Sequence, residues 1–349
     1  MALLLMVSIK SIFMVRRHPN KNGIIQIMET VELALASDQG AYCGLLVAAC
    51  TAARCADKNA ELVFHILDGG IGDDDFAFLE KCLLKCHANA RTDRILVSQD
   101  AFAGFPSFHG SKMTYARLLL PRILSDVKRV IYFDTDFYWR ADVVELWNES
   151  VDVVSLAATP DQYPHGVANE RRWFGRNGVP FPEGRYFCAG ICVINLDRWR
   201  ADGIMDRSLE FLRSHPTAEC VDQTALNAIL PTGDVRLLPV RWGRFVRPMT
   251  PAEFKVQMAL HFASDAPWNT SGSTKMMTDA QLLWFRTNAE LRAITLWQSL
   301  RLHYSPFEIV RYRLTYLLVM RLPPVRWLFH LFMARTGRGY FDERVDSWI

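Results

Sequence analysis

Short apolar runs alternate with longer amphipathic stretches along most of this chain. The short runs are rich in β-branched residues, which is typical of buried strands, and they cover Val31–Ser37, Glu61–Asp68, Arg94–Ser98, Arg129–Asp134, Asp152–Thr159, Gly190–Asp197 and Val235–Val240. The longer stretches have helical periodicity and cover Ala41–Asp57, Asp74–Ala90, Thr114–Leu124, Ala201–Ser214 and Val221–Leu230. This alternation predicts an α/β fold with a mostly parallel central sheet covered by helices on both faces.

The predicted elements divide the chain into three parts. Residues 29–275 contain the alternating strands and helices, and residues 276–349 are predicted to be helical and basic. Residues 1–28 are predicted to be an extension outside the core. Its apolar stretch contains Lys10 and is followed by Arg16 and Arg17. This is the reverse of a secretory signal, and the stretch is too short to span a bilayer.

Acidic residues gather where the predicted strands end. The strand ends carry Asp38, Asp68, Asp134-Thr135-Asp136, Asp161 and Asn195. Ligands of doubly wound sheets bind at the carboxyl ends of the strands. No G-x-G-x-x-G follows the first strand and no P-loop is present, which excludes the common dinucleotide and nucleoside-triphosphate sites. We therefore expect this edge of the sheet to hold a divalent cation through carboxylates.

The run Val130-Ile131-Tyr132-Phe133 leads directly into Asp134-Thr135-Asp136. Two carboxylates one residue apart can reach one hard cation, Mg²⁺ or Mn²⁺, which can neutralise a diphosphate. A second D-x-D, Asp73-Asp74-Asp75, has no strand before it. We interpret it as a helix N-terminus, where acids interact favourably with the helix dipole.

Charge and cysteine content limit the partners and the compartment. The formal net charge of +3 is too small to indicate nucleic-acid binding. The eight cysteines include no C-x-x-C pair, and most lie among apolar residues, so we interpret them, Cys188 and Cys192 included, as packing residues. Free thiols fit a reducing compartment, and the expected location is therefore the cytoplasm.

Further motifs follow one another along the chain. They are Phe102-Ala103-Gly104-Phe105-Pro106 before His109, Thr114-Tyr115-Ala116-Arg117-Leu118, Tyr186-Phe187-Cys188-Ala189-Gly190, Asp222-Gln223, and His261 before Pro267-Trp268. In order and spacing the chain resembles glycosyltransferase family 8 from about Val31 to Trp268. The resemblance implies a GT-A type nucleotide-sugar-binding fold, with residues 29–275 as the catalytic domain. It also implies a retaining transfer of a hexose from a UDP-sugar, with Mn²⁺ as the metal.

The resemblance also implies roles for single residues. Asp134, Asp136 and His261 match the family's metal ligands, and Asp222 and Gln223 match the pair that faces the donor sugar. The donor-binding residues matched or suggested in this way are Asp38 at the uridine, Arg117, Thr135, His109, Cys188 and Ala189. Asp161 is expected near the donor or acceptor sugar. Whether Gln223 attacks or only stabilises the reacting carbon stays open.

Each of these residues has a simpler interpretation. Asp38 can cap the helix that follows it, Arg117 can be an exposed helix charge, and His261 can be a core histidine. The histidine at 109 can be an ordinary loop residue. A protein that binds a sugar or a nucleotide without turnover is the alternative to an enzyme.

Three positions depart from the family's pattern. Cys188 stands where the family usually has Asn, whose amide hydrogen-bonds the donor sugar better than a thiol. Ala266 stands where a Lys would neutralise the β-phosphate, with Arg244 and Lys275 as nearby cations. Thr224 replaces an acid that often follows the Asp-Gln pair.

Arginine and apolar residues dominate the C-terminal part. Residues 301–340 contain seven arginines and one acid, Glu308, and Pro323-Pro324 divides them into two short helices. Basic amphipathic helices bind anionic membrane surfaces, whereas a helical cap on the domain or an oligomer contact is the alternative. We expect a peripheral enzyme on the cytoplasmic face that acts on a glycan or glycolipid, such as a lipopolysaccharide core.

Overall fold

The computed structural model describes residues 29–108, 110–149, 151, 153–246, 253–263, 265–269, 276–322, 324, 325 and 328. Its main sheet has seven strands in the order β3-β2-β1-β4-β7-β6-β8. In chain order these are β1 (Thr30–Ser37), β2 (Glu61–Asp68), β3 (Ala90–Leu96), β4 (Arg129–Phe133), β6 (Leu156–Pro160), β7 (Phe187–Asn195) and β8 (Val235–Leu237). All seven overlap the predicted strands, and β3 and β6 are displaced by a few residues.

The sheet is mostly parallel, as predicted. Strand β1 runs parallel to β2 and β4, β2 to β3, and β6 to β8. Strand β7 runs antiparallel to both of its neighbours, β4 and β6. Asn195 therefore pairs with Arg129, at the opposite edge from Asp134. The expectation that Asn195 ends with the acids is wrong, because an apolar run does not reveal the direction of its strand. The first residues of β7 lie instead at the edge of the sheet that carries Asp134.

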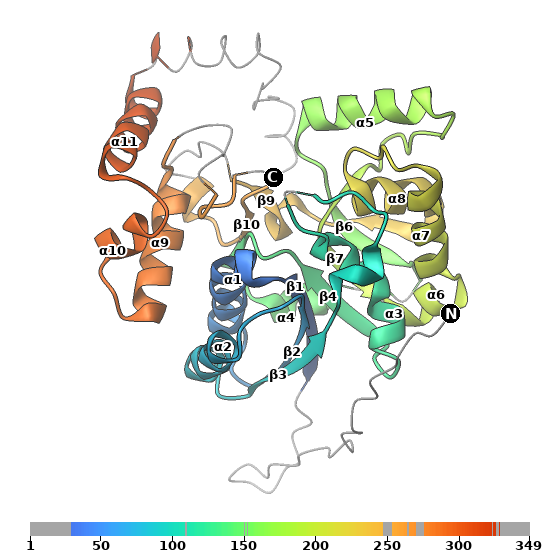
Figure 1. Cartoon of the computed structure of the whole chain (residues 1–349), viewed down its shortest axis with the longest axis horizontal. Coiled ribbons are helices and arrows are strands. Elements are labelled where there is room, and N and C mark those ends of the chain that lie inside the picture. The colour runs from blue at the N-terminus through green and yellow to red at the C-terminus, as the bar shows by residue number, and fades with distance from the viewer. Residues whose placement is uncertain are drawn as a thin grey trace, which may run out of the picture.

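Helices cover both faces of the sheet (Figure 1). The first face is covered by α1 (Tyr42–Cys55) and α2 (Asp73–Cys86), which bury Leu45 and Leu79 against β1 and β2. The second face is covered by α3 (Leu120–Ile123), α6 (Leu196–Ala201), α7 (Ile204–Ser214) and α8 (Val221–Ile229). Two short or peripheral helices are α4 (Val143–Trp147) and α5 (Pro164–Arg176). Asp73–Asp75 form the first turn of α2, as expected.

The segment predicted as a helix over Thr114–Leu124 has a tighter winding. Met113–Leu119 form the 3₁₀ helix η3, and only the next four residues form α3. Pro121 lies in the first turn of α3, where its missing N–H costs nothing. The 3₁₀ segment directs Arg117 into the interior, because its buried side includes Tyr115, Ala116 and Leu118.

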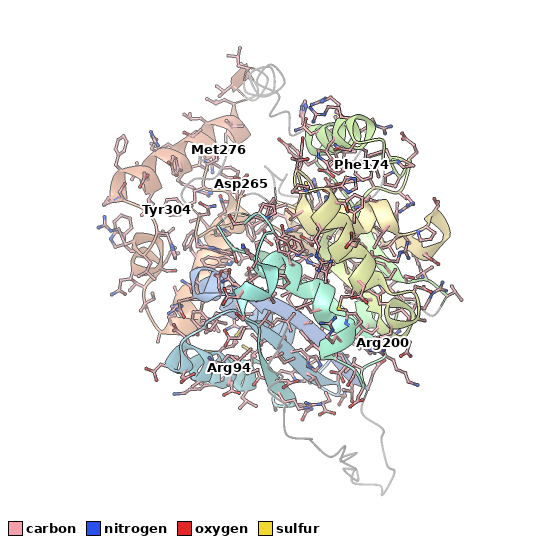
Figure 2. All side chains as sticks on the ribbon, turned by 45° about the vertical axis from the view of Figure 1, so that its right-hand side comes forward. Arg94, Phe174, Arg200, Asp265, Met276 and Tyr304 are labelled. Atoms are coloured by element: carbon pink, nitrogen blue, oxygen red, sulfur yellow. The ribbon has the colours of Figure 1, made fainter. Side chains whose placement is uncertain are left out.

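A smaller sheet joins the C-terminal helices to the main domain. It contains β5 (Phe137–Trp139), β10 (Ala259–His261) and β9 (Arg244–Phe245), in that order. Helices α9 (Asp279–Arg292), α10 (Leu296–Arg301) and α11 (Pro306–Arg321) follow. Leu260, Trp284 and Tyr312 share one apolar core, and Tyr304, labelled in Figure 2, donates to the carbonyl of Pro267 at 3.0 Å. None of the helices in the described residues is long and apolar enough to cross a membrane. The division at residue 275 stays a prediction.

Candidate active site

Asp134, Asp136 and His261 come together at the carboxyl end of β4. The two acids lie in the turn from β4 to β5, and β10 pairs antiparallel with β5 so that His261 faces Phe137. One ligand atom from each of the three side chains lies within 4.8 Å of the others. Nε2 of His261 is 3.2 Å from Oδ1 of Asp136. The metal ligands expected from the sequence are thus brought together by two strands that are more than a hundred residues apart.

Packing fixes the His261 ring in place. The ring stacks on Phe137 with centroids 4.4 Å apart and meets the edge of Phe245 at 5.1 Å. A Cβ on Gly190 would lie 2.3 Å from Cε1 of His261, so glycine is needed there to leave room for the ring. The second ring nitrogen, Nδ1, is 3.9 Å from Sγ of Cys188. Metal-binding histidines are usually oriented through this other nitrogen.

The electrostatics of the cluster favour a cation. Burial raises the pKa of Asp134 to about 6, with Arg117 opposing the rise and Asp136 adding to it. Burial acts to lower the pKa of His261, but Asp136 and Cys188 outweigh it and raise this pKa well above its usual range. Oδ1 of Asp136 is buried, and the contact that it makes with Nε2 of His261 at 3.2 Å does not have hydrogen-bond geometry. The two carboxylates supply the oxygen ligands that Mn²⁺ and Mg²⁺ take, and the imidazole adds a nitrogen ligand, so the residues present fit a divalent cation.

Arg117 is buried at the centre of the site and is not an exposed helix charge. Its Nη2 donates to Oδ1 of Asp134 at 2.7 Å, and its Nε lies 2.9 Å from Oδ2 of Asp222. Its Nη1 donates to the carbonyl of Ala189, and its guanidinium lies 4.3 Å from the ring centroid of Tyr132. The side chain is 4% exposed. In the structure Arg117 therefore orients two acids of the site.

Gln223 is held on both sides of its amide. Its Oε1 accepts from the backbone N–H of Ala189 at 2.9 Å, and its Nε2 donates to Oδ2 of Asp161 at 3.0 Å. Asp222 is buried and accepts from the hydroxyl of Thr114. The Ala189 peptide thus joins both parts of the site, since its N–H binds Gln223 and its carbonyl binds Arg117, the partner of Asp134.

The remaining predicted residues differ in how closely they join this cluster. Asp38 follows β1 and caps a short 3₁₀ helix by accepting from the N–H of Ala41 at 3.2 Å, so the simple capping role is present. Its Oδ2 also accepts from Ser111 at 2.6 Å. Thr135 lies partly exposed in the β4–β5 turn. The histidine at 109 lies outside the described residues.

Two residues at the site carried no separate role in the sequence analysis. Tyr186 stands just before β7, and its hydroxyl lies 3.2 Å from Nε2 of Gln223. Glu170 lies on α5, is fully buried, and accepts from the Tyr186 hydroxyl at 2.9 Å. In the sequence Glu170 belongs to the polar stretch Asn169-Glu170-Arg171-Arg172, which has the pattern of a solvated helix face. Nothing in that pattern indicates burial.

Comparison with known proteins identifies the family of this chain. The profile of glycosyl transferase family 8 matches residues 2–262, three quarters of the chain, and the chain belongs to this family. General stress protein A of Bacillus subtilis is 30% identical over 191 residues, covering 53% of this chain and 64% of that protein. The lipopolysaccharide 1,3-galactosyltransferase of Salmonella typhimurium is 25% identical over 197 residues, covering 54% of this chain and 55% of that protein.

Solved structures agree on the fold. The galactosyltransferase LgtC in complex with donor and acceptor sugar analogs superposes with a TM-score of 0.64 at 24% identity, over 76% of this chain and 98% of that one. This protein therefore has the GT-A-like α/β fold predicted from its sequence. The chain spans about half to two thirds of the length of the curated relatives described above.

Proposed function

We propose that this protein is a retaining glycosyltransferase that moves a hexose, galactose or glucose, from a UDP-sugar to a glycan or glycolipid acceptor. The observation that carries the proposal is the Ala189 peptide, which connects the Asp134–Asp136–His261 cluster, through Arg117, to Gln223. A glycosyl transfer needs a cation at the diphosphate and a polar group at the reacting carbon, and the two clusters offer both.

The proposed roles rest on the family resemblance, and the placement of the residues supports them. Asp134, Asp136 and His261 would hold Mn²⁺ or Mg²⁺, which neutralises the UDP leaving group when bound. Asp222 and Gln223 would face the donor sugar, with Asp161 behind Gln223. Asp38 would bind the uridine. Arg117 is assigned to the donor side through Asp134, and the backbone around Thr135, Cys188 and Ala189 would line the donor, with His109 as a further contact.

The names of the relatives support the choice of donor and acceptor. The Salmonella relative is a lipopolysaccharide galactosyltransferase, and LgtC is a galactosyltransferase. We therefore propose galactose as the first donor to test and a lipopolysaccharide core as the first acceptor. The alternative, binding without turnover, is favoured by Cys188, whose thiol faces His261 and takes the place of an amide that could hydrogen-bond the sugar.

A donor screen tests the proposal. Purified protein with Mn²⁺ is given a panel of UDP-sugars, alone and with a lipopolysaccharide-core acceptor, and released UDP is measured. We expect release from one UDP-hexose, abolished by chelation and by Asp134→Ala/Asp136→Ala. The matched control is Asp73→Ala/Asp75→Ala in the other D-x-D, at the start of α2, which should retain release. Binding of a UDP-sugar without turnover under all these conditions would support the alternative and overturn the enzyme.

We further propose that α11 attaches the enzyme to an anionic membrane surface on the cytoplasmic face. One side of α11 packs inward through Ile309, Tyr312, Tyr316 and Val319, whereas the other exposes an apolar row of Phe307, Val310, Leu314 and Leu318. Exposed Arg301, Arg311 and Arg321 lie close to this row in the chain. Apolar rows beside arginines bind anionic lipids through burial and charge together.

Vesicle sedimentation tests the attachment. Phe307→Ser/Leu314→Ser should bind vesicles of anionic lipid less tightly than the native protein, and vesicles of neutral lipid should bind neither. Leu96→Ser is the matched control, because Leu96 is equally exposed but lies at the end of β3. Equal binding of the α11 variant and the native protein to anionic vesicles would remove this proposal and leave the transferase proposal unaffected.

A further inference from the structure

Glu170 is a fully buried carboxyl that accepts hydrogen bonds from two hydroxyls. It is 0% exposed, and its Oε2 accepts from Tyr186 at 2.9 Å and from Thr224 at 2.8 Å. Buried carboxylates are costly and are rarely kept without a specific task. Burial raises the pKa of Glu170, and the bonds from Thr224 and Tyr186 oppose that rise. A purely apolar contact would stabilise α5 at lower cost.

A chain of hydrogen bonds connects Glu170 to Gln223 through the Tyr186 hydroxyl. A carboxylate oxygen only accepts, so the Tyr186 hydroxyl donates its single proton to Glu170. The oxygen of that hydroxyl is then left as an acceptor, and Nε2 of Gln223 donates to it at 3.2 Å. Glu170, acting through Tyr186, thereby favours the same orientation of the Gln223 amide as Asp161 and the Ala189 N–H do.

Packing keeps the Tyr186 hydroxyl in line with both partners. The Tyr186 ring stacks on Phe181 with centroids 5.3 Å apart and planes 9° apart. Phe174 of α5 meets Tyr186 edge-on at 6.5 Å, and Figure 2 labels it where α5 covers the domain. Because α5 carries both Phe174 and Glu170, the helix holds the ring and its hydroxyl together.

We propose that Glu170 is a positioning residue that acts through Tyr186 to hold the Gln223 carbonyl oxygen toward the start of β7. The inference rests on the proposed function and deepens it. With Nε2 bound to Asp161 and Tyr186, the amide presents its oxygen beside the Ala189 N–H. A carbonyl oxygen stabilises positive charge at the reacting carbon of a sugar, whereas a rotated amide would place an N–H there.

The first test needs no turnover. The chain has eight glutamines, so selective ¹⁵N-glutamine labelling gives few side-chain amide signals, and loss of one pair in Gln223→Ala identifies Gln223. In protein without metal or donor, we expect this pair to shift in Glu170→Gln and in Tyr186→Phe. Glu183→Gln is the matched control, since Glu183 is an exposed acid that pairs with Arg171 of α5, the helix that carries Glu170. If the Gln223 amide signals do not shift in either variant, and both variants are folded, the proposal is overturned.

The second test separates positioning from structural support. Glu170→Gln should lower kcat about tenfold or more with the KM for donor within about twofold. In the Gln223→Ala background the same substitution should change kcat by less than about twofold, because the two residues act as one unit. A purely structural role would lower kcat equally in both backgrounds. If the native protein turns over no UDP-sugar, the proposed function fails, and the amide signals still decide the role of Glu170.

Discussion

Among the residues that the structure describes, a buried basic side chain lies between two carboxylates at two places. Arg117 contacts Asp134 and Asp222 at the carboxyl edge of the sheet. His65, in the middle of β2, lies 2.8 Å from Glu32 of β1 and 3.1 Å from Asp93 of β3. Both cations are more than nine-tenths buried. The two groups therefore have similar geometry, and the difference between them is in what lies beyond the acids.

The His65 group lies on three neighbouring strands, and within the described part of the chain its two acids contact no residue of the candidate site. The Arg117 group continues, because Asp134 belongs to the candidate metal site and the Ala189 carbonyl belongs to the peptide that binds Gln223. Arginine also keeps its charge at every physiological pH, whereas histidine changes its charge near neutrality. A permanent cation suits a site whose geometry must stay constant, and we expect only the first group to control activity.

The largest effect is expected from Arg117→Ala. It leaves two buried carboxylates without their cation, which costs about 3–5 kcal/mol of unfolding free energy. Mn²⁺ binding and transfer should be lost as well, since Asp134 loses the contact that orients it. Chemical denaturation and Mn²⁺ titration by electron paramagnetic resonance measure the two effects. Arg117→Lys, which keeps the charge without the planar fork, should lose Mn²⁺ affinity while staying folded.

Arg94→Ala is the control for that substitution. Arg94, labelled in Figure 2, pairs with buried Asp68 at 2.7 Å, away from the metal cluster. Its loss should lower stability but leave Mn²⁺ affinity unchanged. Equal loss of Mn²⁺ affinity in Arg94→Ala and Arg117→Lys would mean that the loss in Arg117→Lys does not come from its contact with Asp134.

The fold was largely predictable from the sequence because its main signal is local. Apolar runs such as Glu61–Asp68 have the length and composition of buried strands, and they form strands here. The direction of β7 was not predictable, since it depends on the connection and on its neighbours in the sheet. The same limit explains the wrong placement of Asn195.

The site was predictable where motifs are continuous and unpredictable where burial decides the role. Asp134 and Asp136 follow an apolar strand, and the family resemblance added His261. The burial of Arg117 and Glu170 left no mark in the sequence, because both belong to stretches that also fit exposed helices. Their roles depend on contacts with residues from distant segments, Asp222 and Tyr186 among them.

A smaller and more selective effect is expected from Gly190→Ala. The added Cβ would lie 2.3 Å from the His261 ring, which must then leave its present position beside Asp136. We expect Mn²⁺ affinity to fall about tenfold or more, with a modest change in unfolding free energy. Gly175→Ala on α5 is the matched control, because no atom lies within 4 Å of its added Cβ. Unchanged Mn²⁺ affinity in Gly190→Ala would exclude His261 as a ligand.

The smallest effect is expected at His65, and it depends on pH. Burial acts to lower the pKa of His65, but Asp93 and Glu32 raise it above its usual value. The protonated form is therefore stabilised by folding. This contribution is fully present below the unfolded pKa of about 6.5, and it is lost as pH rises through the higher folded pKa. The pKa of Asp93 is lowered, chiefly by its bond to His65, so Asp93 adds stability that is lost only in acid.

Chemical denaturation from pH 5 to pH 9 measures this contribution as a difference between variants. Relative to the native protein, His65→Gln should be less stable by about 1 kcal/mol near pH 5, and the difference should shrink as pH rises. His165→Gln on α5 is the matched control, and it should follow the native pH dependence. Transfer and Mn²⁺ affinity should be unaffected by His65→Gln, because the two acids that pair with His65, Glu32 and Asp93, do not belong to the candidate site. A parallel loss of Mn²⁺ affinity would mean that the two buried cations are coupled through the sheet, and that the separation between stability and activity drawn from their geometry is wrong.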